Sequence, residues 1–186
     1  MEKSFAAGLL IATCSVMYLS AGSTEIAAVL FGFGLYAVCA LELDLFTGKV
    51  GFLYKTAPKK LPPMLICNVA AAAVVGGLYP MPEDAVQSAV SFRLTLPLYA
   101  VLFRSVLCGV VMYVSVAAYK AGRKAAPILG VALFLRGGFL HCIADAAIMA
   151  MGVSVGACTI AQYAAHLCAC AAGNAAGAIV FDRLTN

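Results

Sequence analysis

The segment that decides the fold is Glu42-Leu43-Asp44-Leu45-Phe46-Thr47-Gly48-Lys49, a polar, glycine-containing break in an otherwise apolar run. A second break, Gly137-Gly138-Phe139-Leu140-His141-Cys142-Ile143-Ala144-Asp145, follows about half a chain later. A broken membrane helix exposes backbone N–H and C=O groups that lipid cannot satisfy, so breaks persist only against protein or a water-filled cavity. We therefore predict that the two breaks face each other and form a pore.

The composition indicates an integral membrane protein. The chain has 186 residues, of which 64% are hydrophobic and 11% are charged, and its mean hydropathy is +1.01. Soluble domains carry roughly 25% charged residues, so this chain cannot cover a water-facing surface. It also has no soluble face for a basic patch, which argues against a nucleic acid partner.

The apolar runs predict an all-α membrane protein with six transmembrane helices in one channel domain, residues 1–186. Each span needs about 20 residues. The first apolar run is longer than the 7–15 residues usual in a signal peptide, so we interpret it as a retained span. The six predicted spans are 5–22, 26–54, 61–79, 94–119, 125 to beyond 149, and 155–181. The second span is broken at 44–49 and the fifth at 137–138.

The distribution of Lys and Arg predicts the orientation, because cytoplasmic loops carry an excess of both. With a cytoplasmic N-terminus, the outer loops hold only Arg93, beside Glu83 and Asp84. Both termini are then cytoplasmic, as expected for a protein of the inner (plasma) membrane. The basic residues on the cytoplasmic side are Lys3, Lys55, Lys59, Lys60, Lys120, Arg123, Lys124 and Arg183.

The two halves of the chain resemble each other weakly. Cys67-Asn68-Val69-Ala70 is similar to Gly173-Asn174-Ala175-Ala176, and both lie in stretches rich in small residues. We interpret these stretches as helix packing surfaces. Three spans per half predict two inverted repeats, at about 3–80 and 92–183, and such repeats with interrupted spans place a site near the midplane.

Six charged residues fall inside the predicted spans, where charge is costly and usually faces a partner or a cavity. They either pair with one another or leave one or two basic groups partly free to attract an anion. They are Glu42, Asp44, Asp145, Lys49, Arg104 and Arg136. His141 lies beside a break and is the natural proton carrier near neutral pH, although a purely structural role stays open. We expect His166 to be structural and the eight cysteines to bind no metal.

These residues resemble the formate/nitrite transporter family, which has an aquaporin-like fold. Leu45-Phe46-Thr47-Gly48 is similar to the family motif at the break of the second span. The segment 138–145 is similar to the motif Gly-Phe-Glu-His-Ser-x-Ala-Asn in the fifth span. Further matches are Phe31-Gly32-Phe33-Gly34-Leu35, Arg104-Ser105-Val106-Leu107-Cys108 and Gly173-Asn174.

The resemblance implies a homopentamer in the lipid bilayer with one pore per protomer. A central histidine, matching His141, would lie near a threonine, matching Thr47, and Arg93 would be the basic residue of the outer vestibule. The implied constrictions are Phe31, Leu35 and Phe134 on the outer side, and Leu45, Phe46 and Met112 on the inner side.

Several positions depart from the family pattern. Leu140 replaces glutamate, Asp145 and Gly109 replace asparagines, and Lys49 follows Gly48 where asparagine is common. Arg136 stands where the residue is normally small or apolar. Arg136 is expected either to pair with Asp145 or Asp44 or to add to the attraction of an anion.

We therefore predict proton-linked passage of a small monovalent weak-acid anion, a monocarboxylate or an inorganic anion: formate, nitrite or hydrosulfide. The proton would come from His141 or from vestibule water. An aquaporin-like channel for neutral solutes is the alternative, although paired Asn-Pro-Ala signatures are absent. An enzyme using His141 with Asp145 lacks a nucleophile, a metal set or a cofactor motif, so we expect neither catalysis nor a cofactor.

Overall fold

The computed structural model describes residues 1–186 and is helical throughout, with no strand, so the all-α prediction is confirmed. Four helices are long and apolar enough to cross a membrane, namely α1, α4 together with the 3-10 turn before it, α6 and α9. The elements are α1 (Glu2–Ser20), α2 (Glu25–Ala40), α3 (Phe46–Leu53), η1 (Pro58–Lys60), α4 (Leu61–Leu78), α5 (Glu83–Leu94), α6 (Leu98–Lys120), α7 (Ala126–Arg136), α8 (Cys142–Ser154) and α9 (Ile160–Thr185).

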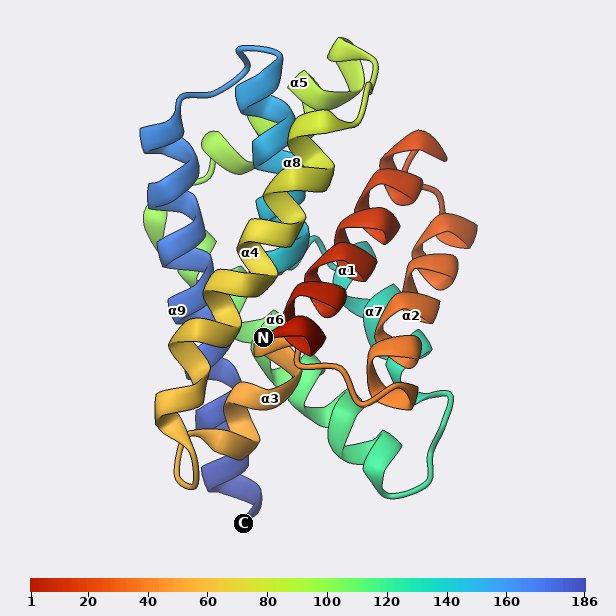
Figure 1. Cartoon of the computed structure of the whole chain (residues 1–186), viewed down its shortest axis with the longest axis vertical. Coiled ribbons are helices and arrows are strands. Elements are labelled where there is room, and N and C mark those ends of the chain that lie inside the picture. Colours follow the sequence, from red (N-terminus) through yellow and green to blue (C-terminus); the bar gives the residue numbers. More distant parts are fainter.

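The helices form an elongated bundle (Figure 1). Helix α1 packs on α4, α6 on α9, and the shorter helices α2 and α7 on each other. Helix α5 and the α8–α9 connection lie at one end of the bundle, and the C-terminus lies at the other (Figure 1). Large apolar side chains such as Ile26, Leu78 and Phe103 are exposed on the outer faces, as expected for surfaces that lipid or other membrane proteins cover.

Three predicted boundaries were wrong. The first break covers residues 41–45 rather than 44–49, because α3 already begins at Phe46. The second break extends from Gly137 to His141. Residues 83–94 form a separate helix, α5, before the predicted fourth span, with Glu83 and Asp84 in its first turn, where acidic groups favour a helix N-terminus. Pro97 then occupies the N-cap position of α6, which begins at Leu98.

Asn68 of α4 satisfies the backbone groups that the first break exposes. Its Oδ1 accepts a hydrogen bond from the backbone N–H of Phe46 at 2.8 Å. Its Nδ2 donates to the backbone oxygens of Ser4 at 2.6 Å and Asp44 at 2.9 Å. The buried amide therefore fixes the start of α3 against α1 and α4.

Asn174 of α9 does the same for the second break. Its Oδ1 accepts from the backbone N–H of Cys142 at 2.9 Å. Its Nδ2 donates to the backbone oxygens of Ser105 and Leu140, both at 2.8 Å. Each break thus has its own asparagine. From the sequence, we interpreted the stretches around Asn68 and Asn174 only as packing surfaces and missed these hydrogen bonds.

Glycines on the partner helices allow these asparagines to approach closely. A Cβ added at Gly8 would lie 2.3 Å from the backbone oxygen of Asn68, and one at Gly109 would lie 2.1 Å from that of Asn174. Real Cβ atoms do not approach backbone oxygens so closely. The glycine at position 109, where asparagine is usual in the resembling family, is therefore required by the packing of α6 on α9.

The far end of α3 is held to α6 and α9 by Asp182. Its carboxylate accepts hydrogen bonds from the hydroxyl groups of Tyr54 and Tyr113, both at 2.8 Å, and it lies 3.3 Å from the Lys55 Nζ. Helix α3 is therefore fixed at both ends, which sets the position of the side chains in its first turn.

Candidate functional site

The two breaks bring Thr47 and His141 together. Thr47 Oγ1 lies 2.8 Å from His141 Nε2, and the two residues are 1% and 2% exposed. Thr47 is in the first turn of α3, and His141 is the N-cap of α8. The contact therefore joins the two half-helices that the sequence predicted to face each other.

The backbone fixes the hydrogen-bonding state of His141. Its Nδ1 accepts a hydrogen bond from the backbone N–H of Ala144 at 3.2 Å, so Nδ1 carries no proton in this arrangement. A neutral ring then has its proton on Nε2, and Nε2–H donates to the Thr47 oxygen. The Thr47 hydroxyl proton has no acceptor in the protein and is free to donate to a third group.

A cavity of about 250 Å³ reaches His141 from one side. We call it the histidine cavity. Phe134 stacks on the His141 ring with a centroid separation of 5.5 Å, and Phe31 meets Phe134 edge to face at 6.3 Å. Tyr18 lies edge to face against Phe31 at 6.3 Å. All four rings line this cavity, so its wall is aromatic up to the histidine.

A larger cavity of about 830 Å³ opens on the other side. We call it the lysine cavity. It is lined by Leu45 and Gly48, which flank Phe46 and Thr47, and by the N-terminal residue Met1. Four lysines and only two carboxylates line it, so its charge is positive. These charged residues are Lys3, Lys49, Lys60, Lys120, Glu42 and Asp44.

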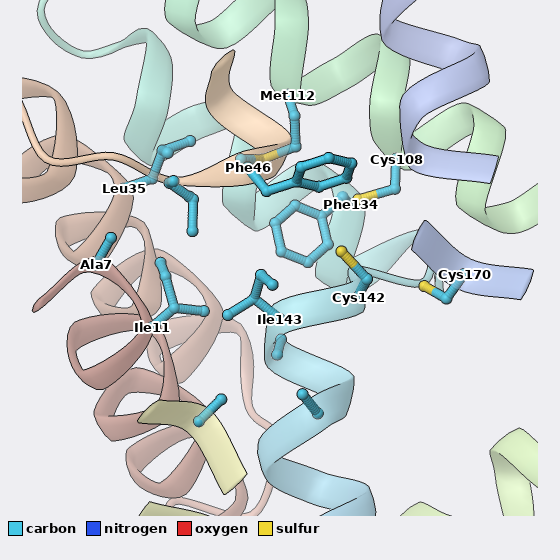
Figure 2. Close-up of a cluster of buried hydrophobic side chains, with 14 of the residues drawn as sticks. Ala7, Ile11, Leu35, Phe46, Cys108, Met112, Phe134, Cys142, Ile143 and Cys170 are labelled. Carbon is cyan, nitrogen blue, oxygen red and sulfur yellow. The ribbon is translucent and has the colours of Figure 1, made fainter. Parts of the chain in front are cut away.

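A single buried apolar cluster, part of which Figure 2 shows, shares residues with the walls of both cavities. It includes Phe31 and Phe134 from the wall of the histidine cavity and Leu45 from that of the lysine cavity. The other three predicted constriction residues, Leu35, Phe46 and Met112, line neither cavity and are buried within the cluster. An ion that passes between the cavities must therefore cross an apolar layer.

Arg93 lines the histidine cavity, and its charge is paired there. It is in α5, and its Nε and Nη2 lie 2.9 and 2.8 Å from Asp145 Oδ1. The other oxygen of Asp145 lies 2.8 Å from His166 Nε2. Arg93 and Asp145 both line the histidine cavity. Because the two groups are paired, their charges compensate each other there. Asp145, His166 and Cys170 also form the one grouping of metal-ligand side chains in the chain.

The predicted pairing of Arg136 with Asp145 or Asp44 was wrong. Arg136 pairs with Glu25 at 3.0 Å, and both side chains are more than half exposed. Asp44 pairs with Lys49 instead, within the lysine cavity.

Arg104 acts at the second break. Its Nη1 donates to the Gly138 backbone oxygen at 2.8 Å. Gly138 has φ +64°, and an added Cβ would lie 2.7 Å from the guanidinium, so the turn needs glycine at this position. Arg104 therefore holds the break in place rather than facing either cavity.

Sequence reasoning missed the contact of His166 with Asp145 and the charge of the lysine cavity. Lys3 and Lys60 were assigned only to the cytoplasmic surface, and their convergence depends on how α1 and α4 pack. The repeated asparagine in both halves was the one sequence signal that could have revealed the Asn68 and Asn174 contacts.

Comparison with known proteins decides the family. A family model described as formate/nitrite transporter matches residues 1–186. The chain belongs to the formate/nitrite transporter family. This family member is therefore a membrane channel or transporter, and its relatives are not enzymes. No curated protein matches it.

Two solved structures are similar to this formate/nitrite transporter family member. One is an FNT family ion channel, 20% identical, with a TM-score of 0.83 over 98% of this chain and 86% of that chain. The other is a pentameric formate channel with formate bound, 21% identical, with a TM-score of 0.78 over 98% of this chain and 93% of that chain. At these identities the similarity establishes a shared fold.

Proposed function

We propose that this chain forms a channel for small monovalent weak-acid anions, namely formate, nitrite or hydrosulfide, with passage linked to protons. The observation that carries the proposal is the Thr47–His141 contact in the apolar layer between the two cavities. His141 lines the histidine cavity, and Thr47 precedes Gly48, which lines the lysine cavity. A solute that travels from one cavity to the other would meet this pair.

The proposed architecture has six spans in two inverted repeats, with α2–α3 and α7–α8 as the broken spans. This architecture is supported by the two buried asparagines, which make corresponding hydrogen bonds in the two halves of the chain. Asn68 binds the backbone of Ser4 and Phe46, and Asn174 binds that of Ser105 and Cys142.

The proposed assembly is a homopentamer in the inner (plasma) membrane. The similarity to a pentameric formate channel and the exposed apolar faces support this assembly. By the excess of Lys and Arg, the lysine cavity faces the cytoplasm and both termini are cytoplasmic.

The lysine cavity would concentrate anions, since a cleft lined by one sign of charge raises the local concentration of the opposite ion. Lys120 has no carboxylate partner in the structure, and its Nζ lies 3.6 Å from the centre of the Phe52 ring. A bare anion loses its hydration in the apolar layer at a cost of several kcal/mol. Protonation removes most of this cost, because the neutral acid is less strongly solvated.

The proton would come from cavity water rather than from His141. A neutral His141 with an unprotonated Nδ1 has only its Nε2 proton, and donation of that proton would leave an unstable imidazolate. Protonation at Nδ1 would break the hydrogen bond from the Ala144 amide. His141 then acts by orienting Thr47, whose free hydroxyl proton donates to an oxygen or sulfur of the passing solute.

Formate uptake into proteoliposomes over a pH series tests the proposal. Wild type should take up formate faster as the outside pH falls, because more of it is in the neutral acid form. His141→Asn, which cannot reproduce both contacts of the ring, should reduce the rate at every pH. Thr13→Val, a substitution on the exposed face of α1, should leave the rate unchanged.

Two results would contradict the proposal. One is a His141→Asn rate and pH dependence equal to wild type. The other is rapid osmotic swelling with glycerol and no formate uptake, which would identify a neutral-solute channel.

A further inference from the structure

A second polar cluster begins at the wall of the histidine cavity, where Asp145 lines it. It consists of Asp145 from α8 and of His166 and Cys170, one turn apart on α9. All three are buried, at 2%, 7% and 0% exposure. Each offers one ligand atom, and the three atoms lie within 4.8 Å of one another.

The spacing of these atoms is close to that of a zinc site. His166 Nε2 lies 2.8 Å and Cys170 Sγ 3.8 Å from Asp145 Oδ2. Tetrahedral zinc with bonds of about 2.0 Å to nitrogen and oxygen and about 2.3 Å to a single sulfur separates its ligand atoms by roughly 3.3–3.5 Å. To bind a shared ion, His166 Nε2 would move about half an ångström away from Asp145 Oδ2. The ligand atoms of His166 and Cys170, which lie within 4.8 Å of each other, would close on the ion.

Arg93 holds the Asp145 carboxylate in an orientation that suits metal binding. Both of its contacts are to Oδ1 of Asp145, so Oδ2 is left to face His166 and Cys170. Carboxylates and histidines that bind metals are usually held by such outer hydrogen bonds. The two negative charges of Asp145 and a Cys170 thiolate would balance a divalent ion, so the occupied cluster keeps the single positive charge of Arg93.

We propose that Asp145, His166 and Cys170 bind one zinc-like divalent cation per protomer, which enters through the histidine cavity that Asp145 lines. Asp145 Oδ2, His166 Nε2 and Cys170 Sγ bond to the ion. Cys170 releases its thiol proton to solvent, and the neutral His166 ring carries its proton on Nδ1. Three protein ligands leave the fourth tetrahedral position for a water molecule.

Metal content tests this independently of transport. The purified, detergent-solubilised oligomer is treated with a chelator, incubated with zinc and washed, and zinc is counted by elemental analysis. Wild type should retain one zinc per chain, and Cys170→Ala and His166→Gln should retain none. Cys168→Ala, which removes an exposed cysteine two residues away on α9, should retain one.

Cobalt(II) gives a second measurement. Wild type and Cys168→Ala should show a sulfur-to-cobalt charge-transfer absorption, and Cys170→Ser, the more conservative variant, should lose it. Melting curves without metal verify that each variant is folded. The proposal is overturned if wild type retains no zinc, or if folded Cys170→Ala retains as much zinc as wild type.

Discussion

Replacing Asn174 by leucine would remove the amide that satisfies the second break and keep a side chain branched at Cγ. The variant leaves the Cys142 N–H and the Leu140 C=O buried without their partner. The Ser105 oxygen lies within α6 and keeps its helical partner. At about 1–3 kcal/mol for each unsatisfied group, the expected loss is about 2–6 kcal/mol of unfolding free energy.

The assay is thermal unfolding of the purified protein in detergent. For a chain of this length the loss corresponds to a fall in Tm of about 5–20 °C. Asn68→Leu should give a loss of the same order, because Asn68 makes the equivalent contacts at the first break. Cys168→Leu, exposed on the same helix as Asn174, should change Tm little. If the Asn174→Leu protein had the same Tm as wild type, the inferred role of Asn174 at the second break would be refuted.

Three further predictions follow from particular contacts. Asp145→Asn should free the charge of Arg93 toward the histidine cavity and raise formate uptake several-fold at low ionic strength, with the gain lost in high salt; equal uptake at both salt concentrations would contradict this. Gly109→Ala should cost about 1–3 kcal/mol through overpacking, measured by Tm, whereas Gly77→Ala, whose Cβ would meet only a side-chain oxygen at 3.8 Å, should not. Arg136→Gln should change the unfolding free energy by less than about 1 kcal/mol, because its ion pair is exposed; a larger loss would indicate that the pair is buried in the assembled oligomer.

The closeness of Thr47 and His141 was expected from the family resemblance. The residues themselves were sufficient for the helical class and the two breaks. These follow from local signals, since a polar, glycine-containing interruption in an apolar run has few solutions in a membrane. The boundary of the first break was misplaced because Thr47-Gly48-Lys49 is a polar segment that we assigned to the break. The start of α3 is set instead by Asn68, more than 20 residues away in the chain.

The partners of the charged residues could not be predicted from the sequence. Arg93 lies 52 positions from Asp145, and Arg136 lies 111 positions from Glu25. Which carboxylate each arginine meets depends on the packing of α5 over α8 and of α7 against α2. The sequence showed equal numbers of acidic and basic residues in the predicted spans, but these residues could pair in several ways.

The most direct test of the channel account is formate flux through the Thr47→Ser and Thr47→Val variants in proteoliposomes. Serine keeps the hydroxyl that meets His141, and valine keeps the shape of threonine without it. We expect Thr47→Ser to transport formate at nearly the wild-type rate and Thr47→Val to lose most of the flux while both remain folded. Equal formate flux through the two variants would contradict passage of the anion by the Thr47–His141 pair.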